Sequence, residues 1–279
     1  MIACADGQTI CGGNPMIFYR GLSLEGKRAL VFGGTSGLGK SIAQGFAQAG
    51  ADVVSVGRRA QEVARTAQEI RALGRRSLEV AADVTRRPDI QRVIDAMLKE
   101  LGGIDILVNS AGLTKRVPSL QLADEDWKHI LDVNLNGTWY ACQMVGAVMK
   151  ERKYGRIINI CSLASFVSVH EVLPYCASKA AVAMLTRCLA AEWAPYNIAV
   201  NGIAPGYFET PMNRHIINEP GRKSAVMTHT PMKRWGNLVE IQGAAIFLAS
   251  DSASFVTGTI LPVDGGFLAQ GVGEGVWTS

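Results

Sequence analysis

Long hydrophobic runs are missing from this sequence of 279 residues. Its apolar runs have the length of single strands, far below the roughly 20 residues that a membrane-spanning helix needs. The first residues, 1–6, also lack the basic region and apolar stretch of a secretory signal. We therefore expect no membrane association and a cytoplasmic location.

Strong charge and paired metal-ligand motifs are missing as well. The net charge is only +4, and the basic residues are scattered without interleaved aromatics, which argues against nucleic acid as a partner. The cysteines form no C-x-x-C pair and have no nearby histidine, so we expect reduced thiols and no metal site. The six are Cys4, Cys11, Cys142, Cys161, Cys176 and Cys188.

What the chain does contain is a regular alternation of predicted strands and helices. Strands are predicted at 28–33, 52–56, 77–81, 104–109, 156–162, 198–203 and 260–263. Helices are predicted from Gly37, and at 60–73, 88–101, 124–151, 174–193 and 239–249. This order predicts a single α/β domain over residues 23–279, a doubly wound, Rossmann-like parallel sheet with helices on both faces. Residues 1–22 match no element and are expected to form an N-terminal arm.

Tyr175 and Lys179 stand four residues apart in an Ala-rich helical segment, so both side chains should project from one helix face. A free phenol is a poor base at neutral pH, but a neighbouring ammonium favours the phenolate and should lower the pKa of Tyr175. Ser162 follows a predicted buried strand, whose end would deliver its hydroxyl to the same place. The three residues predict a device for proton transfer.

A glycine cluster follows the first predicted strand and precedes a helix. Gly33 allows a tight turn, Gly37 lets the backbone approach a pyrophosphate, and Gly39 lets the helix pack on the strand. Ser36 and Leu38 belong to the same loop. Strand, glycine turn and helix together predict a dinucleotide site.

The turn after the second predicted strand indicates which dinucleotide is bound. An acidic residue there holds the ribose hydroxyls of NAD, whereas Arg accommodates the additional phosphate of NADP. This chain has Arg58 and Arg59, and its nearest acid, Glu62, should lie inside the next helix. NADP is therefore the expected cofactor, with NAD still possible if both arginines are merely solvated.

These motifs, together with Asn109-Ser110-Ala111-Gly112, resemble those of the single-domain short-chain dehydrogenase/reductase family. The resemblance runs from about residue 24 to residue 273 and keeps the family's motif order. It implies that Tyr175 exchanges the hydroxyl proton, Ser162 binds the carbonyl, Lys179 lowers the Tyr pKa and holds the nicotinamide ribose, and Asn134 bends its helix and seats a relay water. For the cofactor it implies contacts from Asp83, Val84, Asn109, Ala111, Gly112, Pro205, Gly206, Phe208 and Thr210, and a substrate lid over 208–234.

The substrate is approached through two weaker signals. Within the family, the motifs around Phe208 and Phe267 look like those of gluconate 5-dehydrogenases and 2-deoxygluconate dehydrogenases, which implies a sugar acid or polyol. Arg116 could bind a substrate carboxylate, or could be a solvated loop residue beside Lys115. His170 and Glu171 could bond sugar hydroxyls or have a plain surface role.

Three classes of function remain open at this point. The first is an oxidoreductase of sugar acids or a general carbonyl reductase, and the second is a 3-oxoacyl carrier-protein reductase. The third, a regulator that only senses cofactor, would not need the proton relay. A homotetramer is expected from the family and from surplus apolar positions on helices 124–151 and 174–193.

Overall fold

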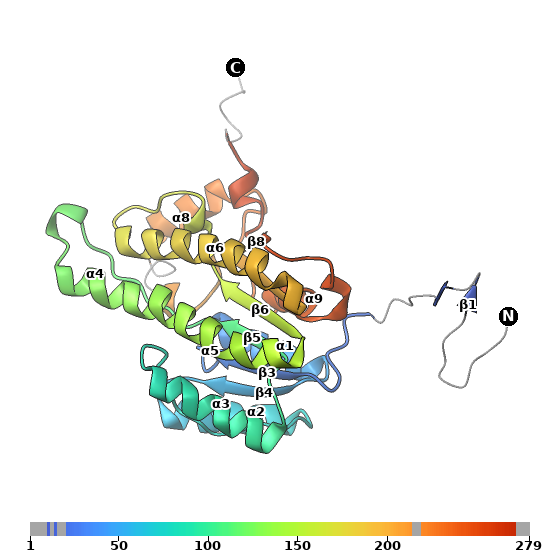
Figure 1. Cartoon of the computed structure of the whole chain (residues 1–279). Coiled ribbons are helices and arrows are strands. Elements are labelled where there is room, and N and C mark those ends of the chain that lie inside the picture. The colour runs from blue at the N-terminus through green and yellow to red at the C-terminus, as the bar shows by residue number, and fades with distance from the viewer. Residues whose placement is uncertain (1–9, 12–13, 16–20, 214–218, 272–279) are drawn as a thin grey trace.

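A six-stranded parallel sheet forms the centre of the protein (Figure 1). It is described from a computed structural model, in which residues 10–11, 14–15, 21–213 and 219–271 are placed. The strands are β3 (Arg28–Phe32), β4 (Asp52–Val56), β5 (Ile106–Asn109), β6 (Gly155–Ile160), β7 (Ile198–Pro205) and β8 (Ile260–Val263). Their order is β4-β3-β5-β6-β7-β8, so the chain reverses its direction of winding between β3 and β5. The predicted doubly wound sheet is confirmed.

Alternating side chains on the strands explain why helices cover both faces. On β3, Leu30 and Phe32 join one apolar cluster, whereas Ala29 and Val31 join the other. The first face is covered by α3 (Arg87–Leu101), α5 (Gly137–Arg152) and α6 (Leu173–Trp193). The second is covered by α1 (Gly37–Gln48), α2 (Ala60–Ala72) and α9 (Glu240–Ala249). Further helices are α4 (Asp124–Leu131) and α8 (Pro220–His229).

The predicted strand at 77–81 is wrong. The segment lies beside the edge strand β4, but its only backbone bonds to the β4 region are at its two ends, where Val53 N donates to Arg76 O and Ala82 N donates to Gly57 O. Leu78 and Val80 nevertheless pack on the first apolar cluster. The apolar alternation is thus satisfied by packing, without a hydrogen-bonded ladder.

The predicted helix at 124–151 is not one continuous α-helix. Between α4 and α5 the chain forms a π-helical turn, η2 (Asp132–Asn136), centred on Asn134. Thr138 Oγ1 donates to Asn134 O at 2.8 Å, which satisfies a carbonyl of the widened turn. Single π turns of this kind occur frequently at functional sites.

The amino-terminal residues differ from the expectation of no regular element. Strands β1 (Ile10–Cys11) and β2 (Asn14–Pro15) pair antiparallel, outside the main sheet. The rest of the expected arm, 1–9, 12–13 and 16–20, lies outside the described residues. In the described part of the chain, no helix is long and apolar enough to cross a membrane.

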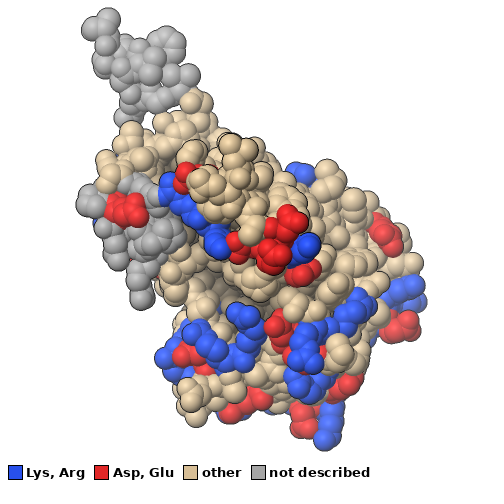
Figure 2. All heavy atoms as spheres, turned by 90° about the vertical axis from the view of Figure 1, so that its left-hand side faces the viewer, with Lys and Arg blue, Asp and Glu red and all other residues tan. Residues whose placement is uncertain are grey.

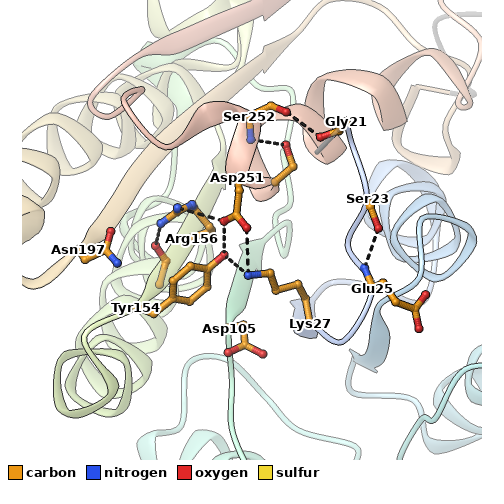
Figure 3. Close-up of polar contacts among 12 residues, drawn as sticks. Gly21, Ser23, Glu25, Lys27, Asp105, Tyr154, Arg156, Asn197, Asp251 and Ser252 are labelled. Atoms are coloured by element: carbon orange, nitrogen blue, oxygen red, sulfur yellow. Dashed lines mark hydrogen bonds and ion pairs between the residues drawn. The ribbon is translucent and has the colours of Figure 1, made fainter. Parts of the chain in front are cut away.

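The amino ends of the strands are joined by a polar network, drawn in Figure 3. Lys27 Nζ donates to Tyr154 Oη at 2.7 Å, and Tyr154 Oη donates to Asp251 Oδ1 at 3.1 Å. The buried Arg156 lies 3.6 Å from the same carboxylate. The network connects the residues before β3 and β6 to the segment after α9. It therefore stabilises the amino ends of the strands, and the glycine loop lies at the opposite, carboxyl ends.

Candidate active site

Ser162, Tyr175 and Lys179 come together beyond the carboxyl end of β6. Ser162 caps a 3-10 turn, η3 (Leu163–Ser165), and its hydroxyl accepts a hydrogen bond from Ala164 N. Tyr175 and Lys179 lie in the first turns of α6, and Lys179 Nζ is 5.7 Å from the centroid of the Tyr175 ring. The Ser162 hydroxyl lies near enough to the Tyr175 phenol to act on its pKa. The sequence therefore placed these three side chains correctly relative to one another.

The electrostatics of the pair differ from the expectation. Burial raises the pKa of Tyr175 above its ordinary value, against the lowering effect of the Ser162 hydrogen bond. Burial also lowers the pKa of Lys179 from 10.5 to about 8, because the ammonium is taken out of water. Lys179 Nζ donates to Ile160 O at 2.6 Å rather than to the phenol. Burial outweighs the effect of Ser162, and the expected lowering of the Tyr175 pKa by Lys179 is not seen.

Asn134 connects the π turn to two neighbouring segments. Its side chain is fully buried, with Nδ2 donating to Leu113 O and to Ser178 Oγ, both at 3.0 Å. Its Oδ1 accepts from Leu113 N at 2.9 Å. Asn134 thus binds the loop after β5 to the helix that carries Tyr175. No described contact joins it directly to the phenol.

The glycine loop has the geometry that the sequence predicts. Gly33 has a φ of 73°, and a Cβ built there would lie 2.5 Å from Ala111 N. A Cβ on Gly39 would lie 2.3 Å from Gly33 O, so the helix approaches the strand too closely for any side chain. Gly37 has a φ of 52°, and Ser36 is the N-cap of α1. Leu38 packs at the border of the second apolar cluster. The glycine loop therefore leads into the amino end of α1 through close backbone contacts, an arrangement that favours an anion at this helix end.

A cleft next to this loop lies where the sheet reverses its winding. It is lined by Phe32, Gly33, Val56, Gly57, Arg58, Ala82, Asp83, Val84, Ala111, Gly112, Leu113 and Val133. Burial acts to raise the pKa of Asp83, but hydrogen bonds from Thr85 and the charges of Arg58 and Arg86 outweigh it and lower that pKa. The Asp83 carboxylate is thereby kept ionised beside the cleft.

Arg58 lines the rim of this cleft, and both Arg58 and the adjacent Arg59 are exposed. Within the described residues, neither side chain forms a hydrogen bond or an ion pair. Glu62 lies inside α2, as expected, and pairs with Arg65. Figure 2 shows the face at the left of Figure 1, where basic and acidic side chains are interspersed rather than gathered by sign.

Asn109 points away from this cleft. Its Nδ2 donates to Asn159 Oδ1 at 2.9 Å and to Cys142 Sγ at 3.2 Å, inside the protein. Its Oδ1 has no partner among the described residues. The side chain therefore supports the strand ends, while Ala111 and Gly112 line the cleft.

The residues after β7 lie opposite the glycine loop. Pro205 ends β7, and a Cβ on Gly206 would lie 2.7 Å from Asp264 Cα. Thr210 is the nearest neighbour of Gly37 across the gap, 3.7 Å from a Cβ built there. Phe208 is 3% exposed and packs in the second apolar cluster, so its ring is part of the core. Of the expected lid 208–234, residues 214–218 lie outside the described residues.

Arg116, which was predicted to bind substrate, forms an ion pair with the acidic side chain of Glu171. Arg116 Nε donates to Glu171 Oε2 at 2.6 Å, and Val117 N donates to Glu171 O at 2.8 Å. His170 is mostly exposed, and its Nδ1 lies 3.7 Å from the same carboxylate oxygen. The loop after Gly112 and the loop between Ser162 and Tyr175 are thus joined.

Tyr207 was not singled out from the sequence. Its ring packs against Trp235 and Phe267, with centroid distances of 5.4 and 5.7 Å. Its hydroxyl lies near enough to Tyr175 to contribute to the raised pKa of that phenol. The only signal was its place directly after Pro205-Gly206.

A parallel sheet with a glycine loop after β3, and with Ser, Tyr and Lys gathered beyond β6, defines an oxidoreductase of the dinucleotide-binding class. Residues 33–268 match the family described as enoyl-(acyl carrier protein) reductase. The chain belongs to the short-chain dehydrogenase/reductase family.

Relatives with assigned activities cover nearly the whole domain. Gluconate 5-dehydrogenase of Gluconobacter oxydans is 37% identical over 244 residues, which are 88% of this chain and 95% of the relative. The 2-dehydro-3-deoxy-D-gluconate 5-dehydrogenase of Bacillus subtilis is 41% identical over 248 residues, 89% and 97% of the two chains. A crystal structure of gluconate 5-dehydrogenase from Burkholderia cenocepacia, in complex with NADP and tartrate, has a TM-score of 0.87 and 40% identity, covering 90% of this chain and 98% of that one.

Proposed function

We propose that the protein is an NADP(H)-dependent oxidoreductase that interconverts a hydroxyl and a ketone on a sugar acid. The observation that carries the proposal is the convergence of Ser162, Tyr175 and Lys179 next to a cleft whose rim holds the exposed guanidinium of Arg58. Relatives of 37–41% identity that are named for gluconate and keto-deoxygluconate support the substrate class.

The residues present fit the cofactor. Gly33, Gly37 and Gly39 leave a loop free of side chains at the amino end of α1, where a pyrophosphate is favoured. Asp83 and Val84 would lie beside the adenine and Ala111 and Gly112 beside its ribose, while Pro205, Gly206 and Thr210 would face the carboxamide end. Arg58 and Arg59 would pair the 2′-phosphate, since neither guanidinium forms a hydrogen bond or a close ion pair with another described residue. The cofactor, when bound, supplies or accepts the hydride.

The protein's own residues would handle the proton and the orientation. The raised pKa of Tyr175 keeps its phenol protonated at neutral pH, ready to donate to the oxygen of a ketone. Ser162 would orient that oxygen, and Lys179 would hold a ribose hydroxyl next to the phenol. Asn134 would keep the loop at Leu113 and the helix at Ser178 in register. The protonated phenol suits the reduction of a ketone, in which Tyr175 would donate its proton.

Arg116 is the residue we propose for binding the substrate carboxylate, with His170 next to it at the mouth of the site. Arg116 lies on the loop that follows the cleft residues Gly112 and Leu113. A guanidinium pairs readily with a carboxylate, as Arg116 does with Glu171. The bond from Arg116 to the carboxylate of Glu171 supports this assignment.

The experiment is a turnover panel with purified protein, NADPH and NADH. The substrates are 5-keto-D-gluconate, its neutral counterpart L-sorbose, and a 3-oxoacyl thioester. Reduction of the sugar acid with NADPH preferred supports the proposal. Preference for the thioester would instead assign a reductase of acyl chains, and activity on the neutral ketose alone would assign a polyol enzyme.

We propose a homotetramer in the cytoplasm. The side chains of Leu173 and Met184 on α6 are 48% and 55% exposed in the single chain, and a second copy could cover them. The free thiols of the described cysteines, Cys142, Cys161, Cys176 and Cys188, suit a reducing compartment.

A further inference from the structure

We propose that Glu171 is an internal competitor for Arg116 and thereby sets the preference of the site between acidic and neutral substrates. The inference rests on the proposed function, in which Arg116 binds the carboxylate of a sugar acid. It concerns a residue that does not act on the reacting carbon, so Glu171 is a specificity-determining residue rather than a catalytic one.

The first support is the geometry of the ion pair. Arg116 Nε and Glu171 Oε2 are 2.6 Å apart, and the two side chains are 38% and 26% exposed. A carboxylate at this place uses the guanidinium donor that an anionic substrate needs. The substrate must therefore either displace Glu171 or bind beside its negative charge.

The second support is the backbone of Glu171. Its φ is 62°, in the left-handed region that residues other than Gly, Asn and Asp seldom adopt. Such a conformation persists only where surrounding contacts hold it. Here the contacts are Val117 N to Glu171 O at 2.8 Å and the Arg116 pair itself. The backbone of Glu171 is thus held by the fold, and its carboxylate is held by the bond from Arg116.

The third support is the position of the pair in the site. Arg116 lies on the loop that Asn134 anchors at Leu113, and Glu171 lies four residues before Tyr175 on the loop that begins at Ser162. The ion pair thus joins the two loops that flank the proton-transfer residues. A change of charge at this ion pair therefore changes the affinity for a charged substrate bound between the two loops.

Charge counting predicts the direction of the effect. Arg116 and Glu171 together carry no net charge, so the wild-type site attracts an acid only as far as Glu171 yields. Glu171→Gln keeps the shape and a hydrogen-bonding oxygen but leaves one positive charge for the substrate. Arg116→Ala does the opposite, because it removes the positive charge and leaves the Glu171 carboxylate, with only His170 at 3.7 Å, next to the incoming carboxylate.

The experiment compares KM for 5-keto-D-gluconate and for L-sorbose in the presence of NADPH. Glu171→Gln should lower KM for the acid by about two- to fivefold, the range of an exposed ion pair, and leave KM for the neutral ketose unchanged. Asp126→Asn is the matched control, because Asp126 pairs with Lys115 at the same 2.6 Å on the neighbouring residue. It should leave the ratio of the two KM values unchanged.

A double-mutant cycle adds a second test. Glu171→Gln introduced into Arg116→Ala should recover part of the lost affinity for the acid, since the repelling charge is removed. Calorimetric titration of D-gluconate into the NADP-loaded Tyr175→Phe protein, with and without Glu171→Gln, measures the same change without turnover. Thermal melting of each variant checks that it folds.

Two results separate the failure of this inference from the failure of the proposed function. If the wild-type protein reduces 5-keto-D-gluconate but Glu171→Gln raises both KM values by one factor, Glu171 binds hydroxyls or shapes the loop, and the competitor role is wrong. An unchanged acid-to-neutral ratio overturns it equally. If the wild-type protein reduces no sugar acid at all, the proposed function fails first.

Discussion

Lys179 Nζ donates a hydrogen bond to the backbone carbonyl of Ile160 at 2.6 Å, at the carboxyl end of β6. Lys179 is 5% exposed, and burial lowers the pKa of its ammonium to about 8. The fold therefore holds a positive charge in a place where water does not solvate it. Such a charge costs stability and is retained where function requires it.

Replacing Lys179 by Met should change the pH dependence of stability. Below pH 8 the lysine is charged in both states and the burial cost is complete. Between about 8 and 10.5 only the unfolded lysine is charged, so the stability of the wild-type protein rises with pH through this window. From about pH 7 to pH 10, the free energy of unfolding of the wild-type protein should rise, relative to that of Lys179→Met, by up to about 3 kcal/mol. Urea unfolding at both pH values measures it, and a difference independent of pH would contradict the lowered pKa.

Asn134→Ala should destabilise the protein and impair turnover. It removes three hydrogen bonds from a fully buried position and leaves the Leu113 backbone groups without partners, at a cost of about 2–4 kcal/mol. Asn136→Ala is the control in the same π turn, because its bond to Asp132 is exposed. Thermal melts of the two variants should differ clearly. Equal effects would show that Asn134 has no special role in holding the turn.

Arg58→Asp should weaken NADPH and improve NADH. A carboxylate repels the 2′-phosphate and accepts bonds from ribose hydroxyls, so KM for NADPH should rise about tenfold or more. Lys99→Asp, with the same change of charge at an exposed position on α3, is the control for general electrostatics. Matching shifts in the two variants, or hardly any shift in Arg58→Asp, would remove Arg58 from cofactor selection.

Light scattering should give a mass four times that of the chain. Met184→Glu on the exposed side of α6 should yield smaller species, because it places a charge in the proposed contact. Leu98→Glu, at a 38% exposed apolar position on α3, should leave the tetramer intact. A monomeric mass for the wild-type protein at micromolar concentration would exclude the assembly.

Elements with strong local signals were predictable from the sequence. The glycine loop and the Tyr175/Lys179 spacing both follow from requirements within a few residues, namely close backbone approach and the pitch of a helix. The lack of a strand at 77–81 was not predictable. An apolar alternation such as Leu78 and Val80 indicates packing, but it does not indicate whether the backbone forms hydrogen bonds with a neighbouring strand.

Features that depend on distant parts of the chain were also hidden. Arg116 and Glu171 are 55 residues apart, and only the fold reveals that they pair. The direction of the Tyr175 pKa depends on how deeply α6 is buried, which its Lys neighbour does not indicate. A bend of the helix at Asn134 was implied by the resemblance, but the bonds that Asn134 makes to Leu113 and Ser178 have no sequence signature.

The most direct test of the account is the Tyr175→Phe protein, measured for turnover and for cofactor binding in parallel. The substitution removes the phenol hydroxyl and leaves the glycine loop and Arg58 intact. NADPH oxidation with 5-keto-D-gluconate, followed by its absorbance, should fall to background, while the affinity for NADPH in a fluorescence titration stays within about twofold of the wild-type value. Turnover near the wild-type rate would contradict the assignment of Tyr175 as the proton donor and, with it, the proposed mechanism.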